Sequence, residues 1–159
     1  MAFFTWIENT RLAEMVRISA YGYPVMITLH ALGLAVMVGM SVILSLRVLG
    51  LYPAIPYTSI QKLLKVAWIG LIINLLSGSS LFAANATGFI VDWVFDTKMV
   101  CIIIGAILVG VMQSMIGSAI ATGHPEAAAG TGLKVIAGLT IFIFAAGMTF
   151  GRLVPYLPP

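Results

Sequence analysis

The sequence predicts an all-α membrane protein, a bundle of four transmembrane helices preceded by a short interfacial amphipathic helix. Hydrophobic residues make up 61% of the chain and charged residues only 8%, whereas soluble domains carry about 25% charged residues. The stretch between Tyr23 and Arg47 has no charged side chain, and it exceeds the about 20 residues that a helix needs to cross a bilayer. Three further apolar stretches follow, so we expect a single integral membrane domain over residues 1–159.

Residues 1–22 predict a helix that lies at the membrane interface. Thr5 and Glu8 have the spacing of a capping box, in which two side chains cap free backbone amides at the start of a helix. Charged residues recur at every third position, which allows ion pairs along a helix: Glu8, Arg11, Glu14 and Arg17. The segment is too short and too charged to span a membrane, and Trp6 near its start is typical of an interfacial anchor.

The predicted spans cover about residues 24–46, 66–86, 97–121 and 133–153. A second capping-box pattern, Thr58-x-x-Gln61, indicates that the helix of the second span begins before it enters the membrane. The connections are a proline-containing loop at 51–59, an aromatic loop at 88–96 and a polar loop at 122–132. These spans and connections leave no room for a soluble domain.

Two stripes of small and polar residues predict where the helices pack. The first span carries one such stripe at helical spacing, with Gly33 beside it: Met26, His30, Met37 and Ser41. The second span carries a longer stripe: Gly70, Asn74, Ser77, Gly78, Leu81 and Asn85. Membrane helices pack through such faces because close approach and side-chain hydrogen bonds replace the hydrophobic drive. We therefore expect both stripes to face other helices.

The orientation in the membrane follows from the acidic residues. Four basic residues flank each side, so the positive-inside rule gives no preference. One group is Arg47, Lys62, Lys65 and Lys134, and the other is Arg11, Arg17, Lys98 and Arg152. Four of the five acidic residues lie with the second group, which leaves that flank near neutral and easier to translocate. We therefore place both termini outside.

His30 is the first candidate functional residue, because an ionisable side chain within a span marks a functional site by default. It lies six residues after Pro24, about 9 Å below the outer end of its helix. At this depth the other spans carry mostly small residues: Ser79, Ser80, Ile104, Gly105 and Ala146 to Met148. An imidazole beside small residues could admit a flat macrocycle. Alternatively, His30 forms a hydrogen bond with Ser79, Ser80 or a backbone carbonyl, and the small residues only bring helices together.

Three further residues could join His30 in a cofactor site. Met148 lies at its depth, and a thioether with an imidazole suits haem iron or Cu(I), although methionine is also common filler. Lys98 and Arg152 flank the outer ends of the third and fourth spans, where cations could pair with haem propionates. Snorkelling to the lipid headgroups is the alternative role for both, and a neighbouring aspartate is a further partner for Lys98.

Four other polar residues are predicted to have structural roles. Asn74 and Gln113 are the deepest polar groups of the second and third spans, and we expect interhelical hydrogen bonds there. Arg47 is predicted to anchor the inner end of the first span in the headgroups. His124 lies in the polar loop on the opposite side from His30, so it is predicted to be solvated.

No catalytic constellation is visible in the sequence. It lacks a Ser-His-Asp set, paired buried carboxylates, a phosphate-binding glycine loop and zinc-ligand spacing, and the absence of C-x-x-C-H excludes covalent c-type haem. The single cysteine, Cys101, excludes an internal disulfide. The net charge of +3 is spread over membrane-flanking positions, so nucleic-acid binding is not expected. We expect a protein that is not an enzyme by itself.

A succession of short motifs runs through nearly the whole chain. The motifs are FFTWIENTRLAEMVRIS, Tyr23-Pro24, Leu29 to Ala35, Leu46 to Gly50, Phe82 to Ala86, Phe95-x-x-Lys98 and Gly151-Arg152 before Tyr156. In this succession the chain resembles a bacterial family of uncharacterised four-helix membrane proteins, distantly similar to the copper-resistance D-type membrane proteins. The resemblance implies a four-helix fold in the bacterial cytoplasmic membrane with both ends outside, and it implies no activity. Relatives are expected to carry a histidine where this chain has Gln113, so a second metal-binding histidine is not expected here.

Three functions are open. The first is a b-type haem or related tetrapyrrole protein that exchanges electrons with an outer-side partner; its residues would be His30 as axial ligand, Met148 as a second ligand, and Lys98 and Arg152 at the propionates. The second is a cofactor-free accessory or assembly subunit, docking as a homo-oligomer or within a larger membrane complex through small-residue faces. The third is copper handling through His30 and the methionines.

Overall fold

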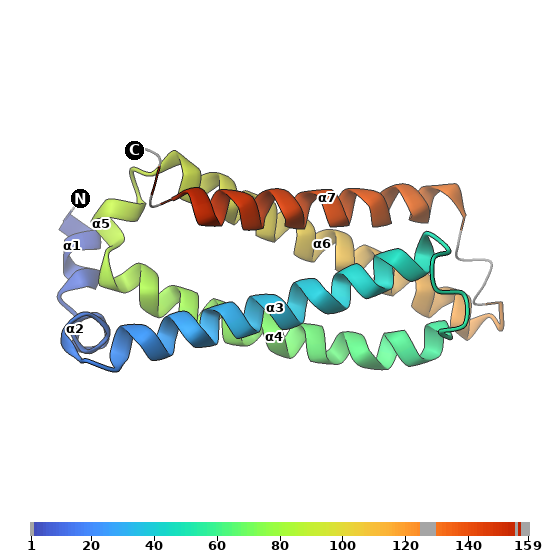
Figure 1. The fold of residues 1–159 in the computed structure, drawn as a ribbon, viewed down its shortest axis with the longest axis horizontal. Helices are drawn as coiled ribbons and strands as arrows, with labels where there is room; N and C mark the ends of the chain where they lie inside the picture. The colour runs from blue at the N-terminus through green and yellow to red at the C-terminus, as the bar shows by residue number, and fades with distance from the viewer. Residues whose placement is uncertain (1, 125–129, 155, 157–159) are drawn as a thin grey trace.

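The structure is a computed structural model that describes residues 2–124, 130–154 and 156. Its four long helices are α3 (Gly22–Val48), α4 (Tyr57–Ala84), α6 (Trp93–Ala121) and α7 (Thr131–Leu153). Its short helices are α1 (Ala2–Glu8), α2 (Arg11–Ile18) and α5 (Ala86–Phe89). Figure 1 shows the long helices running side by side. Each predicted span overlaps one long helix, although the second span was predicted to end at residue 86 and α4 ends at Ala84. The predicted all-α four-helix architecture is confirmed.

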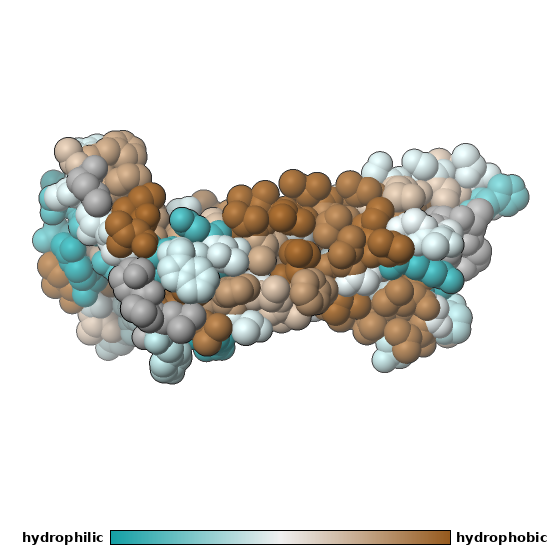
Figure 2. All heavy atoms as spheres, turned by 90° about the horizontal axis from the view of Figure 1, so that it is seen from above, coloured by the Kyte–Doolittle hydropathy of each residue, from teal (hydrophilic) through white to brown (hydrophobic). Residues whose placement is uncertain are grey.

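The surface of the bundle is that of a multi-pass membrane protein. All four long helices are long and apolar enough to cross a membrane, and only 28% of the most apolar window of each is buried inside the protein. Most of their apolar surface therefore needs lipid as its solvent. Figure 2 shows hydrophobic residues gathered along the middle of one face, with hydrophilic residues toward both ends, as a bilayer requires.

The bundle consists of two helix pairs. Helix α3 packs most closely against α4, and α6 against α7; the pairs meet through α3 with α7 and, more weakly, α4 with α6. Glycines explain the close α3–α4 contact: a Cβ atom at Gly33 would lie 2.7 Å from the carbonyl oxygen of Gly70, and one at Gly70 would lie 2.9 Å from that of Gly33. The two predicted stripes therefore face each other at this crossing, as membrane helix packing favours.

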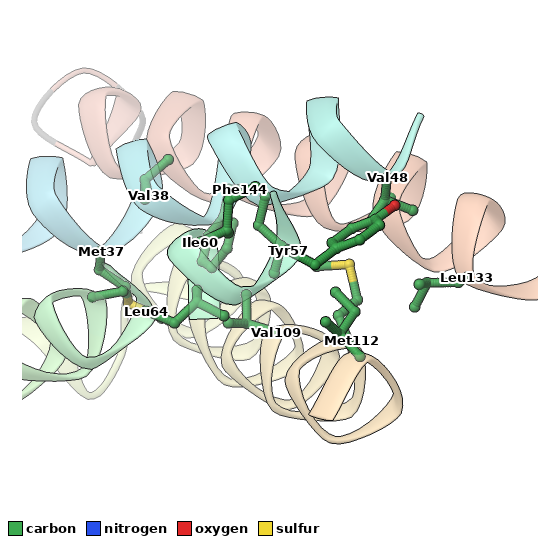
Figure 3. Packing of buried hydrophobic residues seen from close by; sticks show 14 of the residues in the cluster. Met37, Val38, Val48, Tyr57, Ile60, Leu64, Val109, Met112, Leu133 and Phe144 are labelled. Atoms are coloured by element: carbon green, nitrogen blue, oxygen red, sulfur yellow. The ribbon is translucent and has the colours of Figure 1, made fainter. Parts of the chain in front are cut away.

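The hydrophobic core occupies one half of the bundle, at the end that holds the α3–α4 connection. Figure 3 shows its side chains converging from all four long helices. Among the described residues, the cluster begins at Leu34 in α3 and Ile102 in α6, and it ends at Leu71 in α4 and Phe144 in α7. Beyond these positions the two pairs diverge (Figure 1).

Helices α1, α2 and α5 lie at the diverging end, which we call the capped end (Figure 1). The single helix predicted for residues 1–22 is wrong, because the chain breaks between α1 and α2. Thr10 Oγ1 donates to the carbonyl of Ile7 at 2.7 Å and accepts from the amide of Ala13 at 3.4 Å. These local bonds end one helix and cap the next.

The predicted capping box of Thr5 and Glu8 is also wrong, because both residues lie inside α1. Glu8 Oε1 instead accepts hydrogen bonds from the backbone amide and the hydroxyl of Thr87, both at 2.8 Å. These bonds tie α1 to α5. They also hold the pKa of Glu8 below its ordinary value of 4.5, the backbone amide having the largest effect.

Contacting phenyl rings join the two helix pairs at the capped end. They come from α1, α4, α5 and α6: Phe4, Phe82, Phe89 and Phe95. The last three are stacked on one another and Phe4 lies edge-on to Phe82, with centroids of the contacting pairs 4.9 to 6.4 Å apart, within the range of favourable aromatic pairs. We call these four residues the phenyl cluster.

At the other end, Arg47 is not the predicted headgroup anchor. Its side chain is 5% exposed, its Nε donates to the carbonyl of Ile55 at 2.6 Å, and its guanidinium lies 4.2 Å from the centroid of the Tyr57 ring. Arg47 therefore holds the α3–α4 connection against the bundle by a hydrogen bond and a cation–π contact.

Candidate functional site

The site is built around His30 in α3 and the facing turns of α4. The ring rests on Gly78, where a Cβ atom would lie 3.0 Å from His30 Cε1. His30 Nδ1 lies 3.1 Å from the carbonyl oxygen of Asn74 and 3.3 Å from its Nδ2, which donates to the carbonyl of His30 at 2.9 Å. The expected backbone-carbonyl bond is therefore present, whereas the alternative partners Ser79 and Ser80 are not used.

These distances favour one tautomer of His30. The amide of Asn74 makes its shorter bond to the His30 carbonyl, so Nδ1 is assigned as the donor to the Asn74 carbonyl. This leaves Nε2 with its lone pair, and within the described part of the chain Nε2 has no hydrogen-bond partner. A histidine held by Nδ1 with a free Nε2 has the arrangement of a metal ligand.

Lys98 of α6 lies between Phe95 of the phenyl cluster and Ile102 of the hydrophobic core, at the level of His30. Its aliphatic stem lies on α7 at Gly151, where a Cβ atom would come within 3.2 Å of Lys98 Cδ. The side chain is half-buried. The two predicted aspartate partners of Lys98 were Asp92 and Asp96, but Lys98 forms no hydrogen bond or ion pair with any described residue. Asp92 instead caps α6 by accepting from the amides of Val94 and Phe95.

The other two predicted site residues are on α7 with exposed side chains. Met148 is 41% exposed, and Arg152 is exposed and has no hydrogen bond or ion pair within the described residues. The structure therefore places His30 and Lys98 at the same level of the bundle, one turn from the core residues Leu34 and Ile102 respectively. It leaves Met148 and Arg152 with exposed side chains. His124 is exposed beyond the end of α6, as predicted.

Gln113 has the structural role predicted for it. Its Oε1 accepts a hydrogen bond from Trp68 Nε1 at 2.7 Å, and its backbone carbonyl accepts one from Gln61 Nε2 at 3.4 Å. Both bonds join α6 to α4. The second predicted capping box is therefore wrong, because α4 begins at Tyr57 and its Gln61 reaches across to α6. Trp68 was missed as the partner, although a tryptophan N–H inside a membrane needs an acceptor.

His30, Asn74, Gly78, Lys98 and Gly151 form what we call the His30 layer. It lies between the hydrophobic core and the phenyl cluster, where the two helix pairs diverge (Figure 1). Sequence reasoning missed Gly78 as the contact of His30 and Gly151 as the contact of Lys98, because stripe patterns show a small residue without showing which side chain packs on it. It also missed the phenyl cluster, whose members are far apart in sequence.

No protein-family model, curated protein or solved structure matches this chain. The resemblance to the four-helix bacterial family therefore stays a prediction. Within the described residues, no three His, Cys, Asp or Glu side chains are grouped as a metal site.

Proposed function

We propose that this protein binds a b-type haem or related tetrapyrrole in a bacterial cytoplasmic membrane and exchanges electrons with a partner at the outer side. The observation that carries the proposal is the free Nε2 of His30, in a ring fixed by Asn74 on its other side. A histidine within a span that faces other helices is a functional residue by default. A free imidazole nitrogen is the common axial ligand of haem iron.

Each residue of the His30 layer has a defined part in this proposal. Asn74 fixes the direction of the His30 ring through its carbonyl, and Gly78 leaves the space in which the ring lies. Lys98, half-buried and without a partner among the described residues, would supply a positive charge for an acidic group. Bound haem supplies one-electron redox chemistry. Met148 would have to turn its exposed side chain inward to serve as second ligand, and Arg152 would have to do the same to reach a propionate.

The test is an absorption spectrum with metal analysis of the protein purified in mild detergent from haem-replete membranes. We expect a Soret band in the wild type and its loss in His30→Ala. His124→Ala is the matched control, because His124 is exposed at the opposite end, and it should keep the band. A colourless wild type, or an unchanged band in His30→Ala, contradicts the proposal.

The same purification separates the two other functions. A colourless protein that co-purifies with a stoichiometric membrane partner supports the accessory-subunit alternative. Copper that is retained by the wild type and lost in His30→Ala supports copper handling, and copper unchanged by His30→Ala ends it.

A further inference from the structure

The half-buried Lys98 has no protein group to balance its charge within the described residues. It lies five residues into α6, which begins at Trp93, so about 8 Å along the helix axis. Charged side chains within a span are costly, and they usually pair with one another or face a functional cavity. His30, the other ionisable side chain of the His30 layer, is no counter-ion for a lysine.

Glycines of α7 determine how Lys98 lies. A Cβ atom at Gly147 would lie 3.0 Å from Cys101 Cβ, and one at Gly151 would lie 3.2 Å from Lys98 Cδ and 3.4 Å from its Cε. The first glycine lets α6 and α7 approach, and the second forms a notch that receives the lysine stem. Arg152, the residue after Gly151, has an exposed side chain that does not pack on a glycine in this way.

We propose that Lys98, seated on Gly151, binds the acidic group of the ligand whose metal His30 holds, and that Arg152 has no part in binding. His30 and Lys98 then form a two-point site for an acidic, metal-centred amphiphile, with contacts from α3 and α6 on opposite helix pairs. This inference rests on the proposed tetrapyrrole binding. It adds that the carboxylate side of the macrocycle faces the half-buried Lys98 and not the exposed Arg152.

Snorkelling to lipid headgroups is the competing role of Lys98, and a metal-free probe separates the two. Protoporphyrin IX is a dicarboxylate macrocycle without metal, and its dimethyl ester lacks the charges. Fluorescence titration of the purified full-length protein in mild detergent measures binding of each. Because a charge-assisted hydrogen bond contributes about 1.5 to 3 kcal/mol, Lys98→Gln should weaken protoporphyrin IX binding by about tenfold or more.

Three controls make the result specific. Lys98→Arg keeps the charge and should bind protoporphyrin IX within a few-fold of wild type, which also excludes a folding defect as the cause. Arg152→Gln should bind like wild type. The dimethyl ester should bind wild type and Lys98→Gln equally. Binding that is unchanged in Lys98→Gln, or lost equally in Arg152→Gln, overturns the inference.

The outcomes also separate this inference from the proposed function. A Soret band in the wild type, with protoporphyrin IX binding unaffected by Lys98→Gln, leaves the haem proposal standing and overturns the role of Lys98. Lys98-dependent binding of protoporphyrin IX by a protein that never holds haem supports the acid site and overturns the haem proposal. A wild type that binds neither molecule overturns both.

Discussion

Among the described residues, His30 has hydrogen-bond partners at its Nδ1 and its backbone carbonyl but none at its Nε2. Its Nδ1 donates to the backbone carbonyl of Asn74, and its own backbone carbonyl accepts from Asn74 Nδ2. Gly78 lies under the ring, and Nε2 has no partner among the described residues. A histidine that only joined two helices would need one of its nitrogens, and Asn74 already provides that bond. The free nitrogen is therefore the part of His30 that helix packing does not explain.

The hydrogen bonds between Asn74 and His30 should stabilise the α3–α4 pair. Interhelical side-chain hydrogen bonds in membranes contribute about 0.6 kcal/mol on average and up to about 1.7 kcal/mol, so Asn74→Leu should lower the free energy of unfolding by about 1 kcal/mol. Equilibrium unfolding in mixed detergent measures this loss. Ser79→Ala is the control, because Ser79 is exposed one turn further along α4. Equal stability of Asn74→Leu and wild type contradicts the role of this bond.

The sequence could predict the depth of His30 but not its partner. Counting residues along four upright helices placed Ser79 and Ser80 beside the ring, and the structure has Gly78 there, one residue away. Depth follows from helix rise, whereas the rotation and tilt of each helix follow from the packing of all its neighbours. The carbonyl of Asn74, one turn below, could therefore not be chosen over the serine hydroxyls from spacing alone.

At the scale of elements, the glycine crossing of α3 and α4 is the feature that positions the His30 layer. A Cβ atom at Gly33 would meet the backbone of Gly70 and Asn74 at 2.7 Å, and backbone atoms cannot move aside as a flexible side chain can. Gly33→Ala should therefore lower the free energy of unfolding by about 1 to 3 kcal/mol, the usual effect of overpacking. Displacement of α4 should also weaken the contacts of His30.

Gly39 provides the matched control in the same helix. No atom lies within 4 Å of a Cβ built there, so Gly39→Ala should leave stability unchanged or raise it by up to about 1 kcal/mol through helix propensity. Thermal unfolding of both variants in one detergent compares them directly. If the two alanine variants are equally stable, the close crossing at Gly33 is not what holds α3 to α4.

The attachment of α1 to α5 should depend on pH through Glu8. Because Thr87 lowers the pKa of Glu8 in the folded protein, the ionised carboxylate stabilises the capped end above the ordinary pKa of 4.5, and this stabilisation is lost as pH falls through the lowered value. Glu8→Gln should therefore be less thermostable than wild type at pH 7, and the difference should vanish under strongly acidic conditions. Glu14→Gln, at an exposed position of α2, is the control. Its difference in thermostability from wild type should not change between pH 7 and strongly acidic conditions.

The element scale also shows why the N-terminal segment was predicted wrongly. The pattern of charges at every third residue fits one helix, and Thr5 and Glu8 have capping-box spacing. Thr10 offers a competing cap through Ile7 and Ala13, and Thr87 offers Glu8 a partner 79 residues away. Local patterns carry no information on that distant partner, so the break and the tie to α5 could not be predicted.

At the scale of the whole molecule, composition was sufficient for the class and the four spans, because lipid requires long apolar helices whatever their packing. The division into a packed half and a diverging half was not predictable. It depends on which helices pair, and the α3–α4 and α6–α7 pairs are held by contacts between residues far apart in sequence. The His30 layer lies where that core ends, so the site is a property of the whole bundle.

The orientation of the bundle decides which side of the membrane an electron partner must occupy. Helix α2 ends at the capped end beside Ser19, and His124 follows α6 at the opposite end; both are exposed. With both termini outside, a membrane-impermeant maleimide on intact cells should label Ser19→Cys, whereas His124→Cys should react only after permeabilisation. The native Cys101 is 8% exposed, so the wild type should stay unlabelled. The reverse labelling pattern would place the capped end, with Lys98 and the His30 layer near it, on the cytoplasmic side and contradict an outer-side partner.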